Sequence, residues 1–443
     1  MEPASLVTMP DEILVKICEN MCRHCSGIDN WESKEGALKR FSLTCRRLRD
    51  IAQPILYHQS APGNMIPFMR TIIERPDLAA QVRNFFTYEA DDPELFDTDI
   101  EIFRAEAQRL NHGNRNKWTR AMLDNKYRYQ QRLFELALAL LPNVKKITLI
   151  VPSRSQEELD GLFGAPVVLK SVHRLTVLPW EPVDFGRFKD ILAMMPRLER
   201  LQIEECHCIT QTLPLAELRT LIIVECGIST ESLQNIIQSC PNLEHFEYQS
   251  WARDYPPEYF GFEEECTWGL AQDILRSRKK TLKHLNLTFN LNCRMDVDDL
   301  GPDDYLSSFD DFDGLETLWL LPIGFGTTPA GFGPPIFPRD VDDLVTMLPQ
   351  SLICLGLCCP LENWQGIKTL ALAIEQGYFP KLKYVMVDQT ECEYDESCEM
   401  LAPLNVSCCN LATKCRSIEY YIHCYVHRNY LFPWPAHEWP INA

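Results

Sequence analysis

A short apolar pattern recurs along most of the chain, and it limits the folds that the chain can adopt. The pattern reads apolar-x-x-apolar-x-apolar, and successive clear copies begin 20 to 39 residues apart. These copies begin at Val144, Val172, Leu198, Leu218, Leu243, Leu282, Leu315, Leu352 and Leu382, and a weaker copy begins at Val82. Because the last three positions alternate, each copy predicts a short strand that is buried on one face.

Proline separates these strands from stretches with helical spacing. A proline stands two or three residues before five of the copies, at Pro142, Pro196, Pro241, Pro349 and Pro380. Each follows a helix-like stretch, at residues 133–141, 188–195, 233–240, 341–348 and 367–375. Since proline cannot continue a helix and pushes the residue before it toward extended geometry, the repeated unit is a helix, a proline stop and a short strand.

Units of this kind bury their apolar faces only by stacking on their neighbours, which predicts a solenoid of parallel strands. A doubly wound α/β sheet is the alternative. It explains the alternation of strands and helices, but not the recurring distance between proline and strand. Three insertions, at residues 251–262, 296–313 and 327–338, are predicted to be loops on one rim of the solenoid.

The first sixty residues have a different character. Pro10, Asp11 and Glu12 begin a helical pattern, because proline and acidic side chains are favoured in the first turn. Apolar residues at one-face spacing follow up to Cys18 and resume at residues 37–55, after a polar insertion. Three short helices in about fifty residues make a poor independent core. We therefore expect this segment to pack against another surface.

Charge and cysteine content restrict the partners and the compartment. The 62 acidic and 43 basic residues give a net charge of −19, whereas nucleic acid and anionic membranes attract excess positive charge. We therefore expect neither as a partner, and no apolar run approaches the roughly 18 residues of a membrane span. The 19 cysteines are an odd number, and residues 1–10 lack the features of a secretory signal. Reduced thiols and a cytoplasmic and/or nuclear location are expected.

Motifs for chemistry are scarce in this sequence. It contains no Gly-x-Ser-x-Gly elbow, Walker loop or His-Glu-x-x-His helix, so neither a catalytic residue nor a cofactor is expected. Cys22 and Cys25 have the spacing of zinc ligands, with Cys18 and His24 nearby, but no second pair of ligands is evident. The sequence therefore favours thiols around a loop without a metal, and a zinc site remains the alternative.

The N-terminal residues resemble an F-box. The matching stretches are residues 9–17 (MPDEILVKI), 41–52 (FSLTCRRLRDIA) and 53–57 (QPILY). Together with the repeats, they make the chain similar to F-box/leucine-rich-repeat proteins, with a fungal character in residues 75–83. This resemblance implies an α/β fold, in which a three-helix F-box precedes a leucine-rich-repeat-like solenoid of parallel strands and helices. The implied domains are the F-box at 1–60, a helical linker with a first repeat-like segment at 61–141, and the solenoid at 142–443.

The resemblance also implies a function without catalysis. F-box helices dock on a Skp-type adaptor, which joins a cullin–RING ubiquitin ligase, and the repeats hold a substrate protein. By position, the adaptor-binding residues would be Pro10, Ile13, Leu14, Ile17, Leu43, Leu48 and Ile51. Two alternatives stay open. These side chains could pack only onto the first repeats, and the chain could be a leucine-rich interaction scaffold with no role in ubiquitination.

In a leucine-rich strand, the residues between the apolar positions face the concave surface. Here they are Gln202, Ile222, Glu247, Asn286, Trp319, Gly356 and Met386. Five of them are predicted to bind substrate, namely Gln202, Glu247, Asn286, Trp319 and Met386. Trp319 and Met386 are the expected energetic anchors, because aromatic and methionine side chains are enriched at interfaces. Leucine-rich repeats often place cysteine where the turn backbone needs a partner, which implies a structural role for Cys206 and Cys226.

Overall fold

A computed structural model describes most of the chain. The described residues are 6–26, 31–60, 65–86, 96–110, 126–151, 168–179, 183–250, 266–290, 306–323, 344–357, 364–387 and 391–410. They form two compact units, of which unit 1 holds the described residues up to Thr148 and unit 2 holds those from Leu149 onward. Each unit is an α/β structure with parallel strands.

Unit 1 begins with a group of helices that share one core. A short 3-10 turn, η1 (Leu6–Thr8), precedes α1 (Asp11–Met21), α2 (Arg23–Ser26), α3 (Trp31–Ser42) and α4 (Arg46–Leu56). The buried side chains at their centre are Leu14, Cys18, Cys22, Leu38, Phe41, Leu48, Ala52 and Ile55. We call these four helices the helical module. Its smallest helix, α2, lies in the polar insertion, where the sequence pattern predicts no helix.

The parallel strands of unit 1 begin immediately after the helical module. The elements are β1 (Gln59–Ser60), α5 (Met65–Glu74), α6 (Pro76–Ala79), β2 (Asn84–Phe86), α7 (Asp97–Arg109), α9 (Lys126–Leu140) and β3 (Lys146–Val151), whose first three residues belong to unit 1. Strand β2 pairs in parallel with both β1 and β3, and Phe85 lies beside Ile147. The weak copy of the repeat at Val82 therefore forms a strand. Strands β1 and β2 contain two and three residues, too few to show a period in the sequence.

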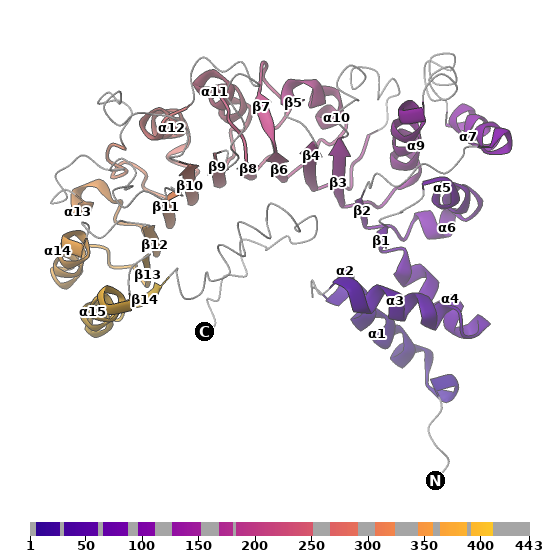
Figure 1. Cartoon of the computed structure of the whole chain (residues 1–443), viewed down its shortest axis with the longest axis horizontal. Coiled ribbons are helices and arrows are strands. Elements are labelled where there is room, and N and C mark those ends of the chain that lie inside the picture. Colours follow the sequence, from indigo (N-terminus) through magenta and orange to yellow (C-terminus); the bar gives the residue numbers. More distant parts are fainter. Residues whose placement is uncertain are drawn as a thin grey trace, which may run out of the picture. The chain divides into compact units, whose positions relative to one another are not determined.

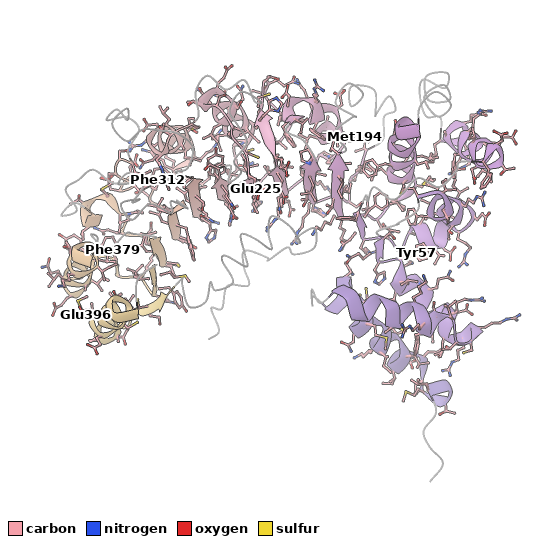
Figure 2. All side chains as sticks on the ribbon, viewed as in Figure 1. Tyr57, Met194, Glu225, Phe312, Phe379 and Glu396 are labelled. Atoms are coloured by element: carbon pink, nitrogen blue, oxygen red, sulfur yellow. The ribbon has the colours of Figure 1, made fainter. Side chains whose placement is uncertain are left out.

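Stacked aromatic rings fill the core behind these strands. Tyr57, Phe68, Phe85 and Phe134 form a continuous stack, with ring centroids 5.6 to 6.3 Å apart. Tyr57, labelled in Figure 2, stands at the end of the helical module, so the stack joins that module to the strands of unit 1.

Unit 2 repeats a strand and a helix in regular order (Figure 1). Its strands are β4 (Arg174–Pro179), β6 (Arg200–Glu204), β8 (Thr220–Val224), β9 (His245–Gln249), β10 (His284–Asn290), β11 (Thr317–Ile323), β12 (Cys354–Leu357), β13 (Tyr384–Val387) and β14 (Ser407–Asn410). Its helices are α10 (Lys189–Ala193), α11 (Thr230–Ser239), α12 (Trp268–Leu275), α13 (Leu344–Met347), α14 (Trp364–Glu375) and α15 (Glu391–Leu401). A separate small pair consists of β5 (Val183–Asp184) and β7 (Cys206–Cys208).

The strands of unit 2 are parallel and lie side by side in chain order, from β4 to β14. The helices cover one side of these strands, and the other side is a continuous strand face (Figure 1). A doubly wound sheet would reverse its strand order and carry helices on both faces. Unit 2 therefore has the stacked arrangement that the repeat predicts.

Pairing between strands aligns the copies of the repeat. The second apolar position of each copy lies beside that of the next, which gives the buried row Leu175, Leu201, Leu221, Phe246, Leu285, Leu318, Leu355 and Val385. Burying one such side chain fully contributes about 1.5–3 kcal/mol relative to leaving it exposed. Phe312 and Phe379, labelled in Figure 2, are also buried in this unit.

Charged residues of alternating sign lie in the turns that immediately precede five strands, a feature that the repeat pattern does not predict. The members of this charge ladder follow the first apolar position of five successive repeats, at Glu199, Arg219, Glu244, Lys283 and Glu316. The backbone N–H of each, from Arg219 onward, donates to the carbonyl of the member before it, at 2.8 to 2.9 Å. Glu244 accepts side-chain hydrogen bonds from Arg219 at 2.9 Å and from Lys283 at 2.8 Å. The charges therefore alternate in sign along the stack.

Two buried cysteines complete the turns after neighbouring strands, as the repeat resemblance implies. The Sγ atom of Cys226 accepts from the backbone N–H of Cys206 at 3.0 Å, and its thiol donates to the carbonyl of Val224 at 3.1 Å. Glu205 and Glu225 stand in these turns with left-handed backbone, at φ values of 50° and 52°. Burial raises the pKa of Cys226 well above its ordinary value, so the thiol stays protonated and acts as a structural hydrogen-bonding group.

Some expectations fall wholly or partly outside the described residues. Two predicted rim loops, at 251–262 and 327–338, lie outside them, as do residues 296–305 of the third. The end of the predicted solenoid, residues 411–443, also lies outside them. Among the helices in the described ranges, none combines the length and the apolar character that a membrane crossing requires.

Candidate functional site

Helix α1 carries two apolar stripes, and only one of them belongs to the core of the helical module. Leu14 and Cys18 are fully buried in that core. Ile13 and Ile17 lie four residues apart on a neighbouring stripe, where Ile13 is 47% exposed and Ile17 is half-buried. Residues four apart share a helix face, so Ile13 and Ile17 form an apolar strip that this module leaves open to solvent.

The second predicted block shows the same division between surface and core. Leu43, in the turn between α3 and α4, is 75% exposed, whereas Leu48 is 3% exposed and lies in the module core. Ile51 is half-buried against that core, and Pro10 is exposed. Leu14 and Leu48 thus pack inside the module, and the predicted residues with open surface are Pro10, Ile13, Ile17, Leu43 and Ile51. The sequence spacing could not distinguish the buried residues from the exposed ones, because neighbouring apolar stripes on α1 carry both kinds.

An ion pair holds the exposed parts of the two blocks together. Arg47 Nε donates to Asp11 Oδ1 at 2.9 Å, and Arg47 Nη2 donates to the carbonyl of Met9 at 2.6 Å. This pair joins the first turn of α1 to the first turn of α4. Ile13 follows Asp11 in α1, and Leu43 precedes Arg47 in the turn before α4, so the ion pair connects the two predicted blocks near both exposed residues in the sequence.

On the strand face of unit 2, the seven residues predicted to share a surface do form one row. Strand pairing places each beside the next, in the order Gln202, Ile222, Glu247, Asn286, Trp319, Gly356 and Met386. Gln202, Glu247 and Asn286 are half-buried and present polar groups, while Trp319 and Met386 are 7% and 9% exposed. The row is therefore confirmed, but its two expected anchors offer less surface than the sequence suggests.

Glycine explains the burial of Trp319. Gly356 is its neighbour in the row, and a methyl group at Gly356 would lie 2.8 Å from Cδ2 and 2.9 Å from Cε3 of Trp319. The indole therefore occupies the space that a side chain on the next strand would fill. The repeat pattern places Trp319 and Gly356 in the same row, but it does not predict that the indole packs over the glycine.

Acidic groups gather at one end of strands β6 and β8. The side-chain amide of Gln202 donates to Glu204 Oε1 at 2.8 Å. Burial raises the pKa of Glu204 to about 8; the hydrogen bond from Gln202 opposes this effect, while the charges of Glu225 and Glu205 add to it. Glu225, labelled in Figure 2, is 7% exposed. At neutral pH the Glu204 carboxyl is therefore mostly protonated, and it can both donate and accept a hydrogen bond.

A second row on the same face carries two histidines that the sequence analysis did not single out. His245 and His284 lie beside each other on β9 and β10, with ring centroids 5.6 Å apart. Nδ1 of His284 lies 3.1 Å from the hydroxyl of Thr317. Burial lowers the pKa of His284, and the neighbouring His245 lowers it further. A neutral imidazole here can donate or accept a hydrogen bond.

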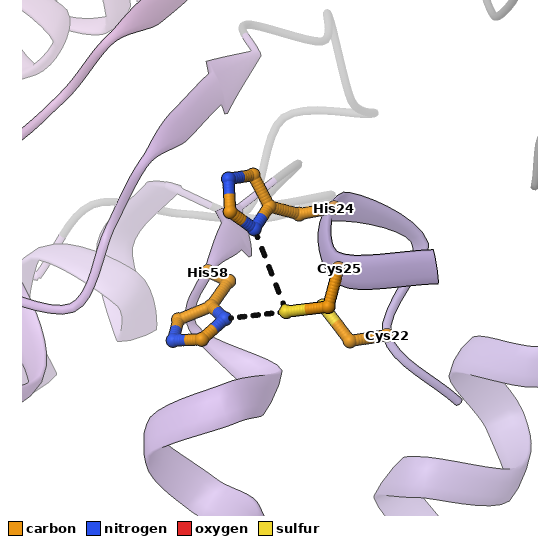
Figure 3. Close-up of side chains that lie close together, drawn as sticks. All are labelled: Cys22, His24, Cys25 and His58. Atoms are coloured by element: carbon orange, nitrogen blue, oxygen red, sulfur yellow. Dashed lines mark hydrogen bonds between the residues drawn. The ribbon is translucent and has the colours of Figure 1, made fainter. Parts of the chain in front are cut away.

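Four potential metal ligands converge in unit 1 (Figure 3). Their donor atoms all lie within 4.8 Å of one another, and the residues are Cys22, His24, Cys25 and His58, which we call the Cys/His cluster. Sγ of Cys25 is 3.2 Å from Nδ1 of His58 and 3.6 Å from Nδ1 of His24. The sequence pattern indicates the first three of these residues but not His58, which is 33 residues from Cys25.

Burial favours the neutral form of His58 in this cluster. It lowers the pKa of His58 to about 4, with further contributions from the charges of His24 and Arg83. A neutral imidazole keeps a nitrogen lone pair that can accept a hydrogen bond or bind a metal ion.

A hollow of about 680 Å³ lies on the helix side of unit 2, beside α13 and α14. Its described lining includes Asp310, Asp313, Leu372 and Tyr378, and no histidine or cysteine is among those described residues. That part of the lining therefore offers carboxylates and a phenol rather than the imidazole and thiol groups that most often serve as acid–base catalysts or nucleophiles.

Comparisons with known proteins add no assignment. No protein-family model matches the chain, and no curated protein matches it. The function therefore has to be argued from the helical module, the strand face and the Cys/His cluster.

Proposed function

We propose that the chain is the substrate-recognition subunit of a cullin–RING ubiquitin ligase of the SCF type. In this proposal, the helical module docks on a Skp-type adaptor, and the strand face of unit 2 holds a substrate protein. The observation that carries the proposal is the open apolar strip of Ile13 and Ile17, together with the exposed Leu43, on a module that already has a core of its own. The F-box-like residues 9–17 and 41–57 supply these side chains.

The module's own packing favours a partner at this surface. Leu14 and Leu48 complete the core, so Ile13 and Leu43 are not needed inside it. Their exposed apolar area would gain about 25 cal/mol for each Å² that a partner covers. Helices α1 and α4 share the module core, and the Arg47–Asp11 pair links their first turns, so the two blocks would meet the adaptor as one folded unit.

The strand face supplies the substrate side of the proposal. A row with polar groups at Gln202, Glu247 and Asn286 offers hydrogen bonds across three strands of a rigid sheet. Holding a substrate there while the adaptor binds the helical module would raise the effective concentration of a substrate lysine near the ubiquitin-charged enzyme. The mechanism is recruitment, and it asks for no catalytic group in this chain.

The test is co-purification of the full-length chain with a Skp-type adaptor, with Ile13→Asp and Leu43→Asp as disabling variants. Both side chains are exposed, so the variants should fold. Burying an unpaired carboxylate in an apolar contact costs several kcal/mol, which corresponds to a loss of affinity on the order of 100-fold or more. Leu372→Asp is the matched control, since Leu372 is 56% exposed on α14 in unit 2.

The proposal requires that wild type and Leu372→Asp bind the adaptor while the two module variants do not. Absence of binding by the wild type, or undiminished binding by both variants, would refute it. Deleting residues 1–56, which removes the helical module but keeps Tyr57 and β1, distinguishes the second candidate, a leucine-rich scaffold without a role in ubiquitination. For that scaffold, partner binding by unit 2 would survive the deletion, and no cullin would be found in the wild-type complex.

A further inference from the structure

We propose that the Cys/His cluster is a structural zinc site. The site would bind one Zn²⁺ ion through two cysteines and two histidines, a ligand set typical of structural zinc. Three ligands come from one short segment, at Cys22, His24 and Cys25, and His58 supplies the fourth from a separate element. This inference does not depend on the proposed role in ubiquitination.

The distances suit a small tetrahedral ion. With Zn–S bonds of about 2.3 Å and Zn–N bonds of about 2.0 Å, the donor atoms of a tetrahedral site lie about 3.3 to 3.8 Å apart. The donor atoms of the cluster already lie within 4.8 Å of one another, and the two measured S–N separations are 3.2 and 3.6 Å. Binding an ion therefore requires movements on the order of 1 Å or less.

The side chains already converge on one point. Nδ1 of His24 and Nδ1 of His58 both face the sulfur of Cys25, and the sulfur of Cys22 lies beside it (Figure 3). The two imidazole rings approach edge to face, with centroids 5.4 Å apart and planes at 73°. Two nitrogens and two sulfurs around one centre is the arrangement that a soft or borderline metal ion requires.

The backbone holds the ligands from two sides. Cys22 ends α1, where its N–H donates to the carbonyls of Cys18 and Glu19, and its side chain is 4% exposed. His58 directly precedes β1, and its carbonyl accepts hydrogen bonds from the N–H groups of Arg83 and Asn84 at 3.0 and 2.9 Å. A zinc ion would thus connect the end of α1 and the short helix α2 to the first strand of unit 1.

A test on the unaltered protein uses the reactivity of its exposed cysteines. Cys25 and Cys45 are both exposed in the helical module, but only Cys25 belongs to the cluster. The full-length chain is stripped of metal under reducing conditions and alkylated with iodoacetamide, with and without one equivalent of Zn²⁺, and mass spectrometry follows each site. We expect Zn²⁺ to slow alkylation of Cys25 at least tenfold and to leave Cys45 unchanged.

Direct metal binding provides the second measurement. Co²⁺ added to the stripped protein should give the intense visible absorption of a tetrahedral cobalt–thiolate site, and Zn²⁺ should displace it at one ion per chain. Cys25→Ser and His58→Gln should each weaken binding by about 100-fold or more, since even changes beyond the direct ligands cost 10- to 100-fold. Cys45→Ser should bind as the wild type does.

Several results would overturn the assignment. They are a wild-type protein that binds neither Co²⁺ nor Zn²⁺, equal alkylation of Cys25 with and without Zn²⁺, and a Cys22–Cys25 disulfide in protein isolated from a reducing cytosol. Retention of full affinity by both Cys25→Ser and His58→Gln would do the same. Since His58→Gln could also impair folding, circular dichroism accompanies it, and the alkylation test on wild type decides the question independently.

Discussion

The indole of Trp319 lies against Gly356, its in-register neighbour on the next strand of unit 2, in the space that a side chain there would occupy. Two neighbouring strand residues of the row are thus packed against each other. It also explains why an aromatic residue on the strand face is almost fully buried.

Replacing Gly356 by alanine should therefore disturb the row. The added methyl group would lie 2.8 Å from the indole, so Trp319 must move, and such overpacking costs about 1–3 kcal/mol. Denaturant unfolding measures the loss. Gly36→Ala is the matched control, because Gly36 is an exposed position of helix α3 where a methyl group meets nothing within 4 Å, and the change should stabilise by up to about 1 kcal/mol. Equal effects of the two substitutions would contradict the fit of Trp319 on Gly356.

The charge ladder predicts a dependence of stability on pH. Hydrogen bonds and charges from Lys283 and Arg219 lower the pKa of Glu244. A carboxyl group whose pKa is lowered by folding stabilises the fold when the pH is above its unfolded pKa of about 4.3. This contribution disappears as the pH falls through the folded pKa. Glu244→Gln should therefore cost about 0.5–1 kcal/mol at pH 7 and almost nothing near pH 3.

Thermal unfolding of wild type and Glu244→Gln across this pH range measures the difference. Glu217→Gln serves as the control, since Glu217 is exposed and precedes the turn that carries the ladder. A constant difference between wild type and Glu244→Gln from pH 7 to pH 3 would show that the ion pairs are not its source.

The strand register of unit 2 was predictable from the sequence because it depends on period alone. Once the apolar positions of each repeat are aligned, the residue between them must fall in one row, as Gln202, Glu247 and Asn286 do. The repeat period does not, however, predict how far each side chain of the row is exposed to solvent. Whether Trp319 projects or lies flat depends on the size of the side chain on the next strand, which is a property of tertiary packing.

The Cys/His cluster, by contrast, could not be predicted completely from the sequence. Cys22, His24 and Cys25 stand together in the sequence, but His58 joins them only because α3 and α4 return the chain to the end of α1. Ligand spacing in a short stretch of sequence does not indicate a ligand that only the tertiary fold brings close. The division of α1 between Leu14 inside and Ile13 outside had a similar origin, since both side chains are apolar and only the packing of α4 distinguishes them.

An ion pair between a buried carboxylate and a partly exposed guanidinium joins α5 and α7 in unit 1. Asp99 on α7 is fully buried, and its carboxylate accepts hydrogen bonds from the guanidinium of Arg70 on α5 and from the backbone N–H of Phe96. Arg70→Met leaves the carboxylate buried without its cation, and breaking such a pair costs about 3 kcal/mol when one partner is partly solvated, as Arg70 is. Arg109→Met is the control, because Arg109 is 65% exposed and pairs with Glu106 on the same helix, so its loss should cost less than about 0.5 kcal/mol. Urea unfolding of both variants decides between them, and a loss for Arg70→Met no larger than that for Arg109→Met would mean that the pair does not hold α5 and α7 together.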